Sequence, residues 1–241
     1  MSWDVPPPDW NGHVGRILDS FFAEVKRRFP DYDAPLTVFG SAPIQLCLDD
    51  SFTSADADIM VTTGAAELRA LAGEIGLGGG GIRSGFAVQI CPPGFFRTTP
   101  RYLEPGRAHQ EMRHGLRIII PHVRDILIGK LHRSRTQDQD ALDGKDLRAF
   151  LRVRQLTGGH PSESELLDDL ISCEPSFRLP PDGGLNHFRL NVEDVWRAVF
   201  GRSVDVRGEI IEPALRQQIL PDQPAVIDRD KLLGDLRPTR E

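Results

Sequence analysis

The spacing of apolar and polar residues divides the chain into two parts. Up to about residue 157, short strand-like runs are interleaved with helical patterns, and beyond it only helical patterns follow. Strands are predicted at 36–39, 56–62, 85–91, 101–103 and 116–120. Helices are predicted at 11–29, 41–48, 65–75, 121–133, 143–155, 162–171, 192–200 and 209–220. This order indicates an α+β fold, with a small mixed sheet, flanking helices and a helical C-terminal part.

Two glycine-containing segments separate these elements. The run Gly78-Gly79-Gly80-Gly81 lacks the Gly-Lys-Ser/Thr ending of a phosphate-binding P-loop, so it is interpreted as a loop between a helix and a strand. The segment Gly158-Gly159-His160-Pro161 predicts a boundary. We therefore expect one unit at 1–157 and a helical region at 158–241.

Asp56 and Asp58 are the most informative residues of the chain. They lie two positions apart in a predicted strand, so both carboxylates project from the same face. Two neighbouring carboxylates repel each other unless a cation neutralises them. Mg²⁺ suits such a pair, because it takes one or two carboxylates together with substrate phosphates. The alternative is an exposed strand end whose acids bind no metal.

Gly40 and Ser41 lie a short way upstream, between a predicted strand and a predicted helix. Glycine has no Cβ and would let the backbone approach a triphosphate, and Ser41 would offer its hydroxyl and a helix N-terminal N–H to phosphate oxygens. Taken alone, the pair is equally typical of a strand-to-helix turn in which Ser41 is the helix N-cap.

Two segments together carry a family resemblance. The first, Phe39-Gly40-Ser41-Ala42-Pro43-Ile44-Gln45-Leu46 followed by Asp56-Ala57-Asp58-Ile59, resembles the signature of the nucleotidyltransferase superfamily, which has the polymerase-beta-like fold. The second, Val123–Leu131 followed by Asp143-Gly144-Lys145-Asp146-Leu147, is similar to small bacterial members linked to toxin–antitoxin and abortive-infection systems. The resemblance covers roughly residues 35–155 and implies that 1–157 is a nucleotidyltransferase-like domain.

The resemblance implies a function. Asp56 and Asp58 would hold Mg²⁺ and act in catalysis, while Gly40 and Ser41 would bind a nucleoside triphosphate. The nucleotide would pass to a hydroxyl on RNA, such as a tRNA end, or on a protein, and the chain would be a component of a toxin–antitoxin system with a cognate antitoxin as partner. The alternative is a catalytically silent binding or regulatory module with the same fold.

Lys130 falls on the apolar stripe of its predicted helix, four residues after Ile126 and three after Leu127. A lysine there must reach the surface or find an anion. A substrate phosphate is one candidate, and an ion pair with Asp143 or Asp146 on the next helix is the favoured one. The resemblance implies catalytic roles for Lys130 and Asp146, and Asp143 is interpreted as a helix cap.

The chain departs from the family pattern in one respect. Many nucleotidyltransferases carry a third carboxylate on a neighbouring strand, and the matching strand here, 85–91, contains no acid. Gln89 is the polar residue nearest the expected place. Another acid would have to supply the role, and the candidates are Glu104, Glu111 and Asp125.

Composition and charge limit the ligands and the cellular location that we expect for this protein. The net charge is −6, yet residues 97–135 hold nine Lys or Arg against three acids. This basic segment would suit a polyphosphate or an RNA end, or its arginines lie on solvated strand faces. The three cysteines show no Cys-x-x-Cys spacing and are expected to be free thiols. Neither a signal peptide nor a long apolar run is seen, so a cytoplasmic protein without membrane contact is expected.

Overall fold

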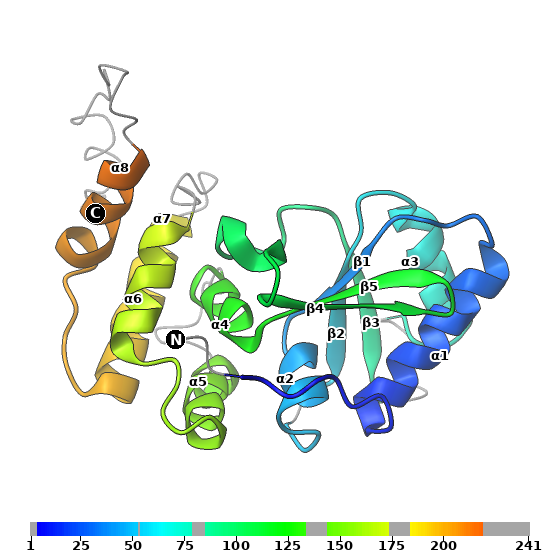
Figure 1. Cartoon of the computed structure of the whole chain (residues 1–241), viewed down its shortest axis with the longest axis horizontal. Helices are drawn as coiled ribbons and strands as arrows, with labels where there is room; N and C mark the ends of the chain where they lie inside the picture. The colour runs from blue at the N-terminus through cyan, green and yellow to red at the C-terminus, as the bar shows by residue number, and fades with distance from the viewer. Residues whose placement is uncertain (1–3, 53, 79–84, 134–143, 174–183, 219–241) are drawn as a thin grey trace, which may run out of the picture.

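A five-stranded mixed sheet lies at the centre of the amino-terminal part of the chain (Figure 1). The computed structural model describes residues 4–52, 54–78, 85–133, 144–173 and 184–218. The strands follow the spatial order β3-β2-β1-β5-β4. Their bounds are β1 Leu36–Phe39, β2 Asp56–Met60, β3 Ala87–Cys91, β4 Ala108–Arg113 and β5 Leu116–Pro121.

The directions of the strands bring the predicted site residues to one end of the sheet. β1 is antiparallel to β2, so the end of β1 lies beside the first half of β2, with Phe39 opposite Asp58. β2 runs parallel to β3 and β1 runs parallel to β5. Within β2, Ala57 and Ile59 are fully buried, while Asp56 and Asp58 are only partly buried and project from the other face.

Helices cover the sheet and extend the fold away from it. α1 (His13–Arg28) and α3 (Ala65–Glu74) lie at one side of the molecule, and α4 to α8 gather at the opposite side (Figure 1). The remaining bounds are α2 Ala42–Cys47, η1 Pro100–Leu103, α4 Val123–Leu131, α5 Gly144–Leu156, α6 Glu163–Ser172, α7 Gly184–Val195, η2 Trp196–Phe200, η3 Val206–Ile211 and α8 Glu212–Gln218. η1 is a 3₁₀ turn, and η2 and η3 are π-helical.

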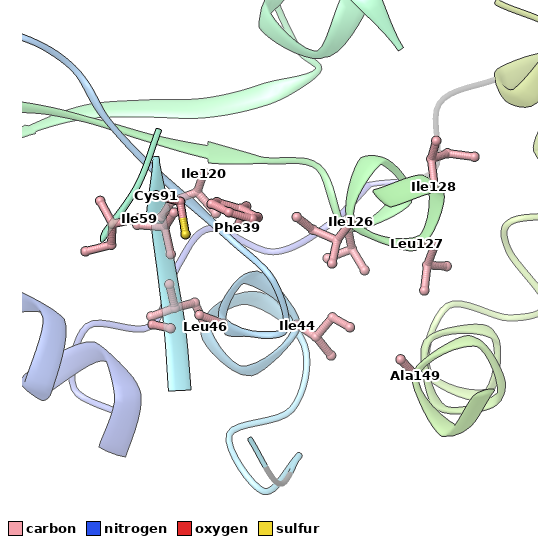
Figure 2. Packing of buried hydrophobic residues seen from close by; sticks show 14 of the residues in the cluster. Phe39, Ile44, Leu46, Ile59, Cys91, Ile120, Ile126, Leu127, Ile128 and Ala149 are labelled. Carbon is pink, nitrogen blue, oxygen red and sulfur yellow. The ribbon is translucent and has the colours of Figure 1, made fainter. Parts of the chain in front are cut away.

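α4 is buried on all sides, which is why its sequence is apolar around most of its circumference. Figure 2 shows Ile126 projecting toward the sheet and Leu127 toward α5, with Ile128 directed the other way. From α2, Ile44 projects toward α4 and α5, and Leu46 toward β2. The buried hydrophobic cluster is continuous from Val14 to Ile211, so the C-terminal helices pack onto the same core as the sheet.

A buried ionic network fastens the C-terminal helices to α4. Arg107 Nε donates to Asp125 Oδ2 at 2.7 Å, and its Nη2 donates to Asp169 Oδ1 of α6 at 3.1 Å. Arg124 also pairs with Asp169. Further along, the side-chain amide of Asn191 donates to the carbonyl oxygen of Leu131 at 3.1 Å. These contacts join α6 and α7 to both ends of α4.

The structure corrects several predicted elements. Residues 101–103 belong to the 3₁₀ turn η1, begun by Pro100, rather than to a strand. The edge strand β4, Ala108–Arg113, was not predicted, because none of its side chains is fully buried and no apolar alternation marks it. Pro121 ends β5, and the helix begins only after His122, whose side chain accepts from the backbone N–H of Arg124.

None of the helices among the described residues combines the length and the apolar character needed to cross a bilayer. The three cysteines Cys47, Cys91 and Cys173 are free, as the sequence predicts, and the structure shows that all three are buried.

Candidate functional site

The turn between β1 and α2 supplies the floor of the site. Gly40 has a φ of +71°, a conformation that favours glycine, and a Cβ at this position would stand 2.2 Å from Asp58 Oδ2. Ser41 occupies the N-cap position of α2, but its side chain makes no capping hydrogen bond. Its hydroxyl oxygen instead accepts from Lys130 Nζ at 3.0 Å. The predicted capping role of Ser41 is therefore wrong, since the buried ammonium of Lys130 takes its oxygen.

Asp56 and Asp58 line the same cavity, as their spacing predicts. Asp56 accepts from Ser54 Oγ at 2.8 Å and from Gln89 Nε2 at 3.1 Å, and Lys145 Nζ lies 3.9 Å from its Oδ1 atom. Asp58 has a weaker contact, with Cys91 Sγ 4.0 Å from its Oδ1 atom. The positive charges of Arg133, Lys130 and Lys145 lower the pKa of Asp58 by electrostatic attraction, without a hydrogen bond to it.

Burial and the neighbouring Asp56 carboxylate together raise the pKa of Asp58 to about 6, and the nearby cations only partly oppose this. The same burial, with the charge of Asp58, raises the pKa of the Cys91 thiol to about 11. The thiol is thus neutral at pH 7 and adds no further negative charge beside Asp58. Burial and the Asp56 charge thus make the ionised form of Asp58 unfavourable, and a cation bound between the two carboxylates would relieve this.

Lys130 forms the opposite wall with Asp146. Its ammonium donates to Asp146 Oδ1 at 2.7 Å, and both side chains are almost completely buried. Arg133 Nη1 donates to Asp146 Oδ2 at 3.2 Å, so Asp146 is paired on both oxygens. The predicted pairing of Lys130 with an aspartate of the next helix is confirmed for Asp146, while Asp143 lies outside the described residues.

These groups surround a cavity of about 540 Å³ at the end of the sheet. All six residues that the sequence singled out line it, namely Gly40, Ser41, Asp56, Asp58, Lys130 and Asp146. Residues that the motifs did not assign to the site line it as well, among them Phe95, Phe96, Arg97, Arg133 and Lys145. For Arg97 and Arg133 the signal in the sequence was the basic segment at 97–135, and for Phe95 and Phe96 it was the glycine turn at Gly94. Lys145 belongs to the segment 143–147 that carries part of the family resemblance.

None of the candidate substitutes for a third carboxylate lines the cavity. Asp125 is fully buried and bound to Arg107 and Thr98, and Glu111 pairs with Arg113 on β4. Glu104 is exposed on the surface near Arg101. Gln89 stands where the sequence places it, opposite Asp58 on β3, and its amide donates to Asp56.

The donor set fits a hard divalent cation bound with substrate. Among the described residues, no group of three or more His, Cys, Asp or Glu side chains is arranged to hold a metal ion. Two carboxylates facing a cavity nevertheless match the way Mg²⁺ is commonly bound, with phosphates and waters as the other ligands. Asp56 and Asp58 are the residues that would hold it.

Comparison of the chain with protein-family models, with curated proteins and with solved structures finds no match. The structure establishes a mixed α/β fold with a five-stranded sheet and an adjoining cavity. The nucleotidyltransferase resemblance stays a prediction from the motifs.

Proposed function

We propose that the protein is a Mg²⁺-dependent nucleotidyltransferase that moves a nucleotide from a nucleoside triphosphate to a hydroxyl group on RNA or protein. The observation that supports it best is the convergence of an acid pair, a glycine turn and a buried lysine in one cavity. Asp58 lies beside Gly40, and Ser41 lies beside Lys130, although these residues come from distant parts of the chain.

Each residue has a distinct part in the proposal. Asp56 and Asp58 would hold the metal ion, which when bound would neutralise charge on the triphosphate. Gly40, having no Cβ, would let phosphate oxygens approach the backbone, and Ser41 would offer its hydroxyl. Lys130, fixed by Asp146, would add a positive charge beside Ser41. These fixed groups would favour the charge that develops as the phosphoryl group transfers.

The bonding changes are those of a nucleotidyl transfer. The oxygen of an acceptor hydroxyl would attack the α-phosphorus, and the bond from that phosphorus to the pyrophosphate oxygen would break. The hydroxyl proton would pass to water, because both oxygens of Asp146, the carboxylate that lines the cavity beside the acid pair, are held by Lys130 and Arg133. A tRNA end or a partner protein is the acceptor that the motif resemblance suggests, and a cognate antitoxin is the partner it suggests.

A labelling experiment tests this function. The wild-type protein is incubated with Mg²⁺, each α-³²P-labelled nucleoside triphosphate in turn, and bacterial tRNA or cell protein as acceptor. We expect label transfer that EDTA abolishes and that Asp58→Asn lowers by at least a hundredfold, the effect of losing one group that stabilises transition-state charge. Asp31→Asn, an exposed aspartate outside the cavity, is the matched control. Equal labelling by wild type and Asp58→Asn would contradict the assignment.

Gln89 favours a second candidate, a catalytically silent module with the same fold. Its amide occupies the place beside Asp56 where an acid would complete a second metal position. Calorimetry with Mg²⁺ and each nucleoside triphosphate separates the two candidates. Metal-dependent nucleotide binding supports the enzyme, whereas absence of any nucleotide binding supports the module.

A further inference from the structure

The loop that follows β3 has a backbone held at two places. Phe96 packs against Phe39, with ring centroids 5.3 Å apart, and edge-on against Tyr102 at 5.6 Å. Two residues further on, Thr98 Oγ1 donates to the buried Asp125 at 2.5 Å. The loop also presses on α4, where a Cβ at Gly129 would stand 3.2 Å from the carbonyl oxygen of Arg97.

Phe95 is different from its neighbour in this loop. Its side chain is 68% exposed, whereas Phe96 is partly buried in the aromatic cluster. Of the large hydrophobic side chains that are exposed among the described residues, Phe95 is the one that lines the cavity. Among the described residues it has no ring contact with another aromatic side chain, and most of its surface is exposed.

An exposed aromatic ring on a fixed loop beside a charged cavity matches the needs of a base-binding surface. Every nucleobase has an apolar face that stacks on aromatic rings. The cavity, at about 540 Å³, lies in the range that holds one small organic ligand. Because Phe96 and Thr98 fix the backbone on the C-terminal side of Phe95, little order would have to be gained on binding.

We propose that Phe95 is the stacking surface for the base of the nucleoside triphosphate, an inference that rests on the proposed function. The acid pair and Lys130 contact the phosphates, and Phe95 contacts the base. Because stacking depends on a flat ring and not on hydrogen bonds, this surface makes the site recognise nucleotides as a class and discriminate only weakly among the four bases.

Binding to two probes tests the inference. Calorimetry with Mg²⁺ compares each nucleoside triphosphate with inorganic tripolyphosphate, for the wild type and for Phe95→Leu, Phe95→Trp and Met112→Leu. Met112 is the matched control, because it is 66% exposed and lies on β4 away from the cavity. Stacking on one ring predicts that Phe95→Leu weakens nucleotide binding by about tenfold and leaves tripolyphosphate binding unchanged. Phe95→Trp retains the affinity, and nucleotide but not tripolyphosphate quenches its added indole fluorescence.

The outcomes separate this inference from the function on which it rests. If the wild type binds nucleotides and Phe95→Leu binds them equally well, the stacking role is overturned while the proposed function stands. Equal weakening for nucleotide and tripolyphosphate also overturns it, since the substitution would then act on the cavity as a whole. If the wild type binds neither probe, both proposals fail together.

Discussion

The carboxylate of Asp58 lies so close to the backbone of Gly40 that it fills the space a side chain at residue 40 would need. A Cβ at residue 40 would stand 2.2 Å from Asp58 Oδ2, and the φ of +71° disfavours any other residue in addition. The glycine of the motif thus serves the position of the aspartate as well as the approach of a phosphate.

Gly40→Ala is therefore expected to act in two ways. The left-handed backbone costs about 1–2 kcal/mol in the free energy of unfolding, and the added methyl group displaces the Asp58 carboxylate. Gly76→Ala is the control, because Gly76 has a φ of +79° but a Cβ there meets nothing within 4 Å. Urea unfolding should show a loss in both variants, while calorimetry should show loss of Mg²⁺–nucleotide binding in Gly40→Ala alone. Unchanged binding in Gly40→Ala would contradict the account.

Asp58 should make the metal-free protein less stable as the pH rises from about 4 to 6. Its pKa is about 6 in the folded protein and near 3.8 ordinarily, so in this window the folded state binds more protons than the unfolded state. The free energy of unfolding then falls with pH, by on the order of 2 kcal/mol after allowance for partial exposure. Asp58→Asn should remove this slope and be the more stable protein at pH 7. Urea titrations between pH 4 and 7, with EDTA, measure it.

The affinity for a divalent cation should also depend on pH. Because protons and Mg²⁺ compete for Asp58, affinity for the cation is expected to fall below about pH 6. A wild-type stability curve that is flat over this window, or that rises with pH to the same extent in Asp58→Asn, would rule out the raised pKa of Asp58 and with it the burial and charge repulsion inferred at the acid pair.

Removal of Lys130 should be strongly destabilising. Lys130→Met leaves the buried carboxylate of Asp146 paired, among the described residues, only with the largely exposed Arg133. Breaking a buried pair costs about 3–5 kcal/mol. The double variant Lys130→Met/Asp146→Leu should recover part of this loss, since it leaves no unpaired charge. The exposed pair of Arg28 and Glu74 is the control, and Arg28→Met should cost less than about 1 kcal/mol. Additive losses in the double variant would disagree with a coupled pair.

The attachment of the C-terminal helices should depend on Asp169. Asp169→Ala removes the shared partner of Arg107 and Arg124, whose side chains are mostly buried, so about 3 kcal/mol should be lost. Glu193→Ala on α7, which breaks a more exposed pair with Arg189, should change stability by less than about 1 kcal/mol. Thermal unfolding compares them, and limited proteolysis should cut Asp169→Ala sooner within the helices beyond α5. Similar behaviour of the two variants would argue against the network as the attachment.

Gln89→Glu should strengthen cation binding. The glutamine amide donates to Asp56, and a carboxylate there would add a third oxygen ligand near the pair. Calorimetry should show tighter Mg²⁺ binding by about tenfold, while metal-free stability falls because three acids repel. Gln45→Glu would be a poor control, since Gln45 is buried, so Gln110→Glu on the outer strand β4 is used instead. Weaker Mg²⁺ binding in Gln89→Glu would count against a metal at this position.

Most residues of the candidate site could be predicted from the sequence because short patterns within single strands and helices mark them. Two aspartates at strand spacing share a face wherever the strand lies, and Lys130 on an apolar stripe requires an anion whatever that anion is. The helices with strong apolar periodicity, such as α1, were placed to within two residues. α6 begins at Glu163, one residue after the predicted start, and the predicted first residue, Ser162, is its N-cap and forms a capping box with Glu165.

Other features depend on contacts that no local pattern carries. Arg107, Asp125 and Asp169 are far apart in sequence, so their network follows only from the packing of α6 against α4. β4 forms no apolar alternation because it is an edge strand. The structure shows that β4 joins β5 through a tight two-residue hairpin turn at His114 and Gly115, whose φ values are 50° and 78°. Gly115 is the residue that could have marked this turn in the sequence.

The pairing of Phe39 with Asp58 across β1 and β2 links assembly of the acid pair to the strand register. A shift of one residue would turn both carboxylates inward and Ala57 and Ile59 outward, exchanging a buried apolar face for a charged one. A chain in which β2 pairs with β1 out of register would therefore lose both core packing and affinity for the cation. Recovery of metal affinity during refolding thus reports that the sheet has formed in the correct register.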